Sequence, residues 1–108
     1  MAVLFTQLDL LGPNDLRVEL AGEDGAPFDP YQITYTFYRH TVTRGTYVVG
    51  APNRLPTRES MGAYYVGERL SSEFLIGDYY IEWMIKRLPD SPREIIGKKE
   101  FAVKGFVP

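Results

Sequence analysis

Few side chains in this 108-residue chain are of the types that catalyse reactions or bind metal ions. It contains no cysteine, which excludes disulfides, thiol nucleophiles and metal sites built on thiolates. His40, the single histidine, stands beside Arg39 at a predicted strand end, without the positioned partner that a general base needs. No hydroxyl lies in a nucleophile-elbow pattern; the serines considered are Ser60, Ser71, Ser72 and Ser91. These residue types therefore predict no catalytic centre.

Acidic residues in one loop raise the question of calcium binding. Glu23, Asp24 and Asp29 crowd a segment rich in turn formers, and calcium prefers carboxylate oxygens. Their spacing does not match the EF-hand pattern, and Pro27 and Pro30 stiffen the loop. We expect no metal site here.

A second group of carboxylates has the residue types of the paired acids that some hydrolases use. Asp78, Glu82 and Glu73 are close in sequence, but Glu82 shares a predicted strand face with Tyr80 and Lys86. That alternation is typical of a solvated sheet face. We therefore expect a protein without enzymatic activity and without a cofactor.

The charges are almost balanced overall but unevenly distributed. Twelve Lys and Arg against fourteen Asp and Glu give −2, which argues against a nucleic-acid binder. Residues 1–29 carry −5 and residues 59–108 carry −1, whereas residues 30–58 carry +4 from four arginines: Arg39, Arg44, Arg54 and Arg58. Two interpretations are open. In the first, the oppositely charged blocks face each other within one fold or face solvent. In the second, the arginines lie at the border of a surface that binds an acidic partner, including another copy of the chain.

Hydrophobic periodicity predicts strands through most of the chain. Alternation or β-branched content marks residues 15–21, 32–39, 46–49, 62–66 and 78–88, and an edge strand in the first ten residues. Residues 94–96 and 100–104 are expected to form a hairpin turning at 97–98, Pro52 and Pro56 to lie in a connection, and residues 69–75 to allow one helical turn. About seven short strands predict an all-β fold, an antiparallel β-sandwich or small barrel, in a single domain over residues 1–108.

The longest predicted strand supplies the expected core. Tyr79, Ile81, Trp83 and Ile85 share one face of it, and Phe37 has the same role in the strand at 32–39. A Gly-Asp turn comes just before Tyr79, which suits a tyrosine that bonds back to the backbone, as in immunoglobulin-like sandwiches. Tyr80 takes that role if the register shifts by one. These features favour the sandwich over the barrel.

The remaining aromatic residues point to contacts with other molecules. Adjacent tyrosines in a strand face opposite sides, so some must be outward, and we expect Tyr38, Tyr64 and Tyr80 to join the arginines at a protein interface. Cross-strand packing and a sugar-binding face are the alternatives. Phe106, in the apolar tail 105–108, and the apolar residues 1–5 are expected to pack on this domain or on a neighbouring subunit.

Three segments in order resemble small accessory virion proteins of tailed bacteriophages. They are GAPFDPYQITY at 25–35, GAPNRLP at 50–56 and IGDYYIEW at 76–83, and the likeness covers roughly residues 15–104. The resemblance implies an immunoglobulin-like fold and a role in head decoration or stabilisation, the neck or the tail. It implies no catalytic residue.

The sequence hypothesis is therefore a structural virion protein whose partners are capsid, neck or tail proteins, with other copies of the chain as a further option. We expect it to fold in the host cytoplasm, because the first residues lack a signal-peptide pattern and no stretch is apolar enough to span a membrane. The alternative is a tail-associated or surface module that recognises carbohydrate or a host protein.

Overall fold

The computed structural model describes residues 3–105, and this range contains strands, turns and loops but no helix. Its strands are β1 (Val3–Thr6), β2 (Arg17–Glu19), β3 (Gln32–Thr41), β4 (Gly45–Arg54), β5 (Thr57–Ser60), β6 (Ala63–Tyr65), β7 (Gly77–Lys86) and β8 (Arg93–Lys104). The expected all-β class is confirmed. No helix that could cross a membrane occurs in this part of the chain.

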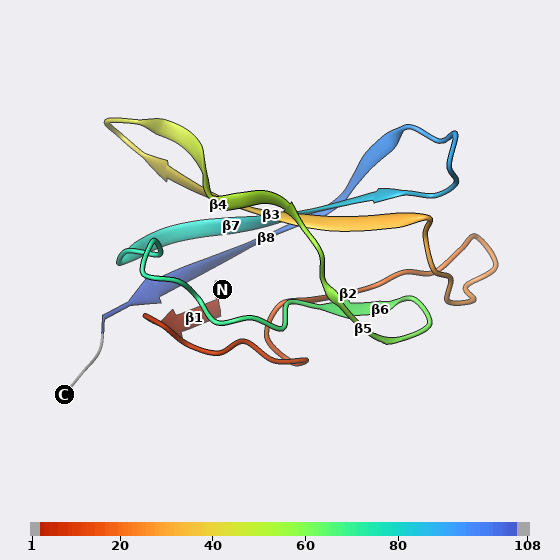
Figure 1. The fold of residues 1–108 in the computed structure, drawn as a ribbon, viewed down its shortest axis with the longest axis horizontal. Helices are drawn as coiled ribbons and strands as arrows, with labels where there is room; N and C mark the ends of the chain where they lie inside the picture. Colours follow the sequence, from red (N-terminus) through yellow and green to blue (C-terminus); the bar gives the residue numbers. More distant parts are fainter. Residues whose placement is uncertain (1–2, 106–108) are drawn as a thin grey trace.

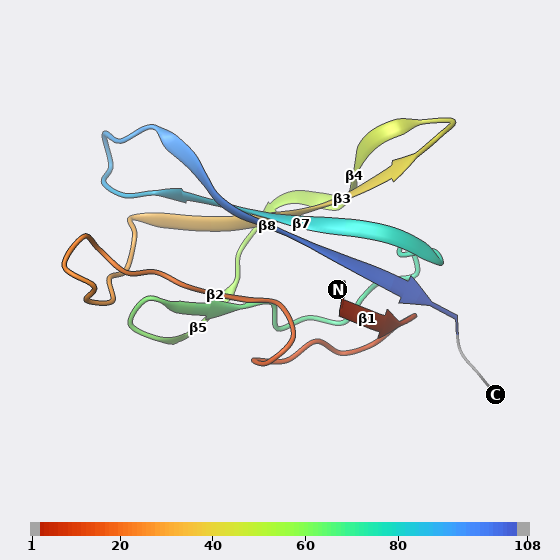
Figure 2. The same cartoon turned by 180° about the vertical axis from the view of Figure 1, so that it is seen from behind.

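The larger sheet has five strands in the order β1-β8-β7-β3-β4 (Figure 1). Neighbours from β8 to β4 are antiparallel, but β1 runs parallel to β8, with Val3 opposite Phe101 (Figure 2). The expectation of a purely antiparallel sheet was therefore wrong. The first strand pairs with the last, which is not its hairpin neighbour, so no turn dictates an antiparallel direction.

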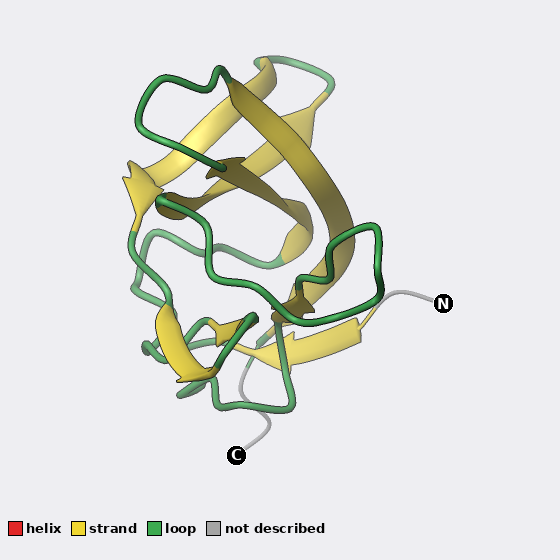
Figure 3. Cartoon of the chain, turned by 90° about the vertical axis from the view of Figure 1, so that its right-hand side faces the viewer, coloured by secondary structure: helices red, strands yellow, loops and turns green. Residues whose placement is uncertain are grey.

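The smaller sheet is antiparallel, in the order β2-β6-β5, and forms a second layer against the larger one (Figure 3). The chain crosses between the layers where β4 leads into β5, because only the two residues between Arg54 and Thr57 separate these strands. Between the layers lies one contiguous cluster of buried apolar side chains. The arrangement is a two-layer β-structure.

The side chains predicted for the core are buried. Phe37 and Ile81 are 0% exposed, and Trp83, Ile85 and Tyr79 are 2–3% exposed. They alternate with outward residues along β3 and β7, as a strand with one face on the core requires. The periodicity thus identified the inner face of the two central strands correctly.

Strand β8 is continuous, whereas the sequence predicted a hairpin turning at residues 97–98. Gly97 pairs with Trp83 and Ile95 with the next residue of β7, so Ile96 is an extra residue in the ladder. Such a bulge bends a strand without ending it. Ile96 packs against the core from this position.

Strand β4 continues through Pro52, where the sequence predicted a connection. Phe37 pairs with Val49 and Tyr35 with Arg54, so the residues between bulge out of the ladder. Gly50 enters this bulge with φ 76°. Proline is tolerated because β4 is an edge strand and its bulge needs no ladder donor there.

The segment before β7 forms turns in place of the expected helical turn. The amide of Phe74 donates to Ser71 O and the amide of Leu75 to Glu73 O, both at 3.1 Å. The Tyr79 hydroxyl reaches back from β7 and donates to the Leu75 carbonyl. This contact is the one expected for Tyr79, and it fixes the turn against the start of the strand.

Candidate protein-binding surfaces

The four arginines of the basic block lie in different parts of the fold and each has a partner within the chain. Arg39 Nη2 donates to the Ile76 carbonyl at 3.0 Å, and Arg44 stacks over the Tyr47 ring at 3.8 Å. Arg54 and Arg58 form ion pairs, described below. The structure therefore does not gather them into one surface, and an interface role for any of them stays a prediction.

Arg58 joins the basic block to the acidic first third of the chain. Its Nη2 lies 2.9 Å from Asp29 Oδ2, and Asp29 also accepts from the Gly62 amide at 3.0 Å and the Tyr64 hydroxyl at 2.8 Å. The Arg58 hydrogen bond, then those of Gly62 and Tyr64, hold the pKa of Asp29 well below its ordinary value. Here the opposite charge blocks face each other inside the fold, the first of the two readings of the sequence.

Tyr64 is 8% exposed, which corrects its assignment to an exposed interface. Its ring belongs to the core, and its hydroxyl is used by Asp29. Burial, followed by the bond to Asp29, raises the pKa of Tyr64. Tyr65, its neighbour in β6, is the more exposed of the two.

Arg54 lies where the chain passes from the larger sheet to the smaller one. Its Nη2 is 2.7 Å from Glu68 Oε2, and both side chains are about one-third exposed or less, at 32% and 26%. Burial, then the Glu68 carboxylate, raises the pKa of the nearby Tyr35. This group of polar residues closes the gap between the layers, so Arg54 is poorly placed to bind a partner.

Tyr38 and Tyr80 lie together on the outer face of the five-stranded sheet, the face turned away from the smaller sheet. They are cross-strand partners with ring centroids 5.0 Å apart and 15° between the planes. Lys98 Nζ lies 5.5 Å from the centroid of Tyr80, and Val48 is the cross-strand partner of Tyr38 on the other side. Since neighbours occupy both sides of the pair, its ring faces are used within the sheet.

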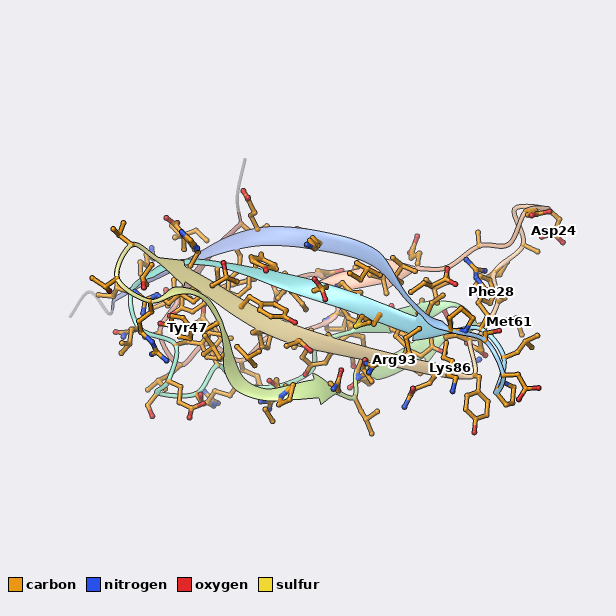
Figure 4. All side chains as sticks on the ribbon, turned by 90° about the horizontal axis from the view of Figure 1, so that it is seen from above. Asp24, Phe28, Tyr47, Met61, Lys86 and Arg93 are labelled. Atoms are coloured by element: carbon orange, nitrogen blue, oxygen red, sulfur yellow. The ribbon has the colours of Figure 1, made fainter. Side chains whose placement is uncertain are left out.

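Charge changes sign along this outer face. At the β7–β8 turn, Lys86 lies directly opposite Arg93, and Figure 4 shows both at the end away from Tyr47. At the other end, Asp78 and Glu100 share a shallow hollow of about 430 Å³ with His40, Tyr79, Tyr80 and Phe101. The alternate residues of β7 therefore run from an acid to a base.

The middle of the outer face is nearly covered and neutral. Glu82 has a side chain only 11% exposed, and Lys98 Nζ lies 3.5 Å from its Oε2. Thr34 and Thr36 are 3% and 5% exposed, and the Thr36 hydroxyl accepts from the Asn53 amide at 2.9 Å. The polar groups in the middle of this face are thus satisfied within the chain.

A second surface, which we name the apolar end, consists of Leu8, Leu75 and Ile76. They are 39%, 55% and 61% exposed. Leu8 lines a hollow of about 130 Å³ with Phe74, the neighbour of Leu75. A Cβ placed on Gly105 would lie 3.1 Å from Ile76 Cδ1 and 3.7 Å from the side chain of Gln7, the residue before Leu8. The three apolar side chains therefore gather around the start of β7 and the end of β8.

Leu8 occupies this surface in an unfavourable backbone conformation. It has φ 64°, in a turn closed by a bond from the Asp9 amide to Thr6 O at 3.1 Å. Bulky residues rarely adopt this left-handed conformation, for which glycine and asparagine are suited. Nothing in the residues 6–9 marks them as a turn, which is why sequence reasoning missed Leu8.

The acidic residues considered for calcium and for hydrolysis do not assemble. Asp24 Oδ1 accepts from the Ala26 amide at 3.0 Å, while Asp29 is bound to Arg58. His40 Nδ1 lies 2.9 Å from Thr46 Oγ1. Within residues 3–105 no three carboxylate or histidine side chains form a group that could hold a metal ion.

No family model, curated protein or solved structure matches the chain. Phe106, the remaining residue expected at an interface, lies outside the described residues.

Proposed function

We propose that this protein is a non-enzymatic structural component of a tailed-phage particle that attaches to other virion proteins through the apolar end. The observation that carries the attachment is the exposed leucine at position 8, held in a left-handed turn. Folding alone favours glycine or asparagine there, so an exposed leucine is best explained by a contact outside the chain. Exposed apolar clusters commonly mark protein interaction sites.

The phage assignment itself comes from the three resembling segments, and we propose an immunoglobulin-like sandwich with it. Two facing sheets and a tyrosine near the start of β7 that bonds four residues upstream support this fold. The parallel pairing of β1 with β8 is an addition to an antiparallel sandwich.

The alternative, a carbohydrate-binding module, has less support from the geometry. Sugars stack on an open aromatic face, but the rings of Tyr38 and Tyr80 stack on each other and are flanked by Lys98 and Val48. Glycan binding that disappears in Tyr38→Ala would nevertheless favour this alternative, and a glycan array on the whole chain tests it.

Incorporation into particles tests the proposal. Particles purified from the encoding phage should contain the protein at a fixed copy number, and Leu8→Asn should reduce that number at least about tenfold because an interface anchor is lost. The variant should remain folded, since asparagine tolerates a left-handed backbone. Leu88→Asn is the matched control, because Leu88 is 65% exposed at the distant β7–β8 turn.

Two results would contradict the proposal at different levels. If purified particles do not contain the protein, the assignment to the virion is wrong. Normal incorporation of a folded Leu8→Asn protein, or an equal loss in Leu8→Asn and Leu88→Asn, would remove the apolar end as the site of attachment.

A further inference from the structure

We propose that the outer face of the five-stranded sheet binds a second copy of this chain, with the strands of the two copies running in opposite directions. This interface is separate from the apolar end and does not depend on the proposed function. Charge, side-chain character and shape along the face each support the same arrangement.

The charges of the face are arranged so that one copy complements another. Lys86 and Arg93 are directly opposed across β7 and β8, and like charges in that position destabilise a sheet unless they are compensated. Neither forms an ion pair within the described residues, and Arg93 Nη2 donates to the neutral Asn53 Oδ1 at 2.6 Å. At the other end of the face, Asp78 and, one row further in, Glu100 form no ion pair within the described residues.

Reversing the second copy brings these opposite ends together. A two-fold axis that runs across the strands along Thr36, Glu82 and Lys98 places each β7 over the β7 of the other copy. Asp78 and Lys86 are each four residues from Glu82, so Asp78 of one copy faces Lys86 of the other. Such an interface is self-complementary, as two-fold symmetry demands.

The same axis also matches the rows on either side of it. On one side are Tyr38 and Tyr80, and on the other are Met84 and Ile95, the latter 53% exposed. The reversed copy lays Tyr80 over Met84 and Tyr38 over Thr34. Glu100, which shares the row of the tyrosines, then lies over Ile95 and one row from Arg93 of the other copy. The central row meets itself, but the Lys98–Glu82 contact leaves it neutral.

The twist of the sheet allows the two faces to approach. In Figure 1 the β3–β4 hairpin rises at one end and the β7–β8 hairpin rises at the other. These hairpins lie toward opposite edges of the sheet, because β4 is one edge strand and β8 lies beside the other, so the raised corners are diagonal (Figure 1). The proposed axis places each raised corner over a low corner of the other copy.

The size of the face predicts a weak dimer. Four strands about 4.8 Å apart and nine residues long, at about 3.3 Å per residue, cover roughly 550 Å² per copy. The total for two copies is about 1,100 Å², near the lower limit for a specific interface. With charged pairs at both ends, association should weaken as salt is raised.

Charge exchange between two variants tests this arrangement. The whole chain should form a dimer by sedimentation equilibrium at high protein concentration and low salt. Lys86→Glu and Asp78→Lys should each raise the dissociation constant at least about tenfold, because each places like charges together twice. Their equimolar mixture should recover association. In the mixed dimer, the new glutamate at position 86 of one variant faces the new lysine at position 78 of the other, and the unchanged Asp78 faces the unchanged Lys86.

Lys99→Glu is the matched control, because Lys99 pairs with the inward residue Ile81 and therefore lies on the other side of β8. It should associate like the original chain. A monomer at every concentration would overturn the proposal. So would a dimer that both single variants leave intact, or a mixture of the two that associates no better than either alone.

Discussion

Phe37 offers a direct measurement of how much the aromatic cluster stabilises this fold. It is 0% exposed and contacts three rings at steep angles: Tyr35 at 5.4 Å and 70°, Phe74 at 5.0 Å and 90°, and Phe101 at 5.7 Å and 76°. Each pair is worth about 0.5–1.5 kcal/mol beyond area burial. Phe37→Leu keeps an apolar side chain but removes all three pairs.

We expect Phe37→Leu to lower the free energy of unfolding by about 2–4 kcal/mol, a large share of a typical total of about 5–15 kcal/mol. Urea unfolding followed by tryptophan fluorescence measures it, because Trp83 is the single tryptophan and is 2% exposed. Ile81→Val is the control: Ile81 is equally buried and loses one methylene, at about 0.5–1.5 kcal/mol.

A loss in Phe37→Leu no greater than in Ile81→Val would refute the assignment of stability to the aromatic pairs. A double-mutant cycle sharpens the result. Phe37→Leu with Phe74→Leu should show a coupling energy of about 0.5–1.5 kcal/mol, whereas Phe37→Leu with Ile85→Val should be additive within about 0.5 kcal/mol.

Three further predictions concern single positions. Because the native pKa of Asp29 is depressed, its carboxylate should stabilise the fold above about pH 4, and this stabilisation should disappear as pH falls through the native pKa. The difference in urea midpoint between the original chain and Asp29→Asn should therefore shrink on acidification. A difference that stays constant with pH would contradict this. Gly62→Ala should cost at least about 2 kcal/mol in urea unfolding, because the new Cβ would lie 2.7 Å from Leu20 O at φ 77°. Gly25→Ala, at φ 80° in open space, should cost only about 1–2 kcal/mol, and equal losses would argue against the steric contact. Tyr79→Phe should cost about 0.5–1.5 kcal/mol by thermal or urea unfolding through loss of the bond to Leu75, and an unchanged midpoint would show that the bond is not stabilising.

Sequence patterns predicted the central strands because a strand that is buried on one face alternates apolar and polar residues. In β7 every second residue from Tyr79 to Ile85 is buried, and β3 repeats the pattern around Phe37. The position of Tyr79 after a Gly-Asp turn also predicted its backbone bond. These features depend on local sequence, which is available without the fold.

Features set by distant contacts could not be predicted. Which of Tyr64 and Tyr65 faces inward depends on Asp29, 35 residues before Tyr64. The same carboxylate selects Arg58 as its partner, so charge blocks alone could not show whether that arginine is free. Leu8 is a further case, because the segment that follows its turn is held by residues 68–70: the Leu70 amide donates to Asp9 O at 2.8 Å, and the Leu11 amide donates to Glu68 O at 2.9 Å.

Bulges caused the remaining errors in strand boundaries. Gly97 and Pro52 both indicate interruptions, but both strands continue. Strand β8 contains one extra residue, whereas in β4 residues 50–53 lie opposite the single residue Thr36. Local propensity favoured a turn at each place. Hydrogen bonds to a long neighbouring strand on both sides of the bulge nevertheless keep each strand continuous. The change from acid to base along the outer face can be read from the alternate residues of β7. Which residues of β3 and β8 lie beside them could be known only from the strand registers.

The pairing of β1 with β8 has a consequence for how the protein is made. Residues 3–6 leave the ribosome long before residues 101–104, so β1 has no partner in the sheet until β8 has been synthesised. Pairings between segments far apart in sequence also slow folding, because a long loop must close first. The β3–β4 hairpin can form while synthesis continues, whereas the larger sheet is completed only after β8 has emerged.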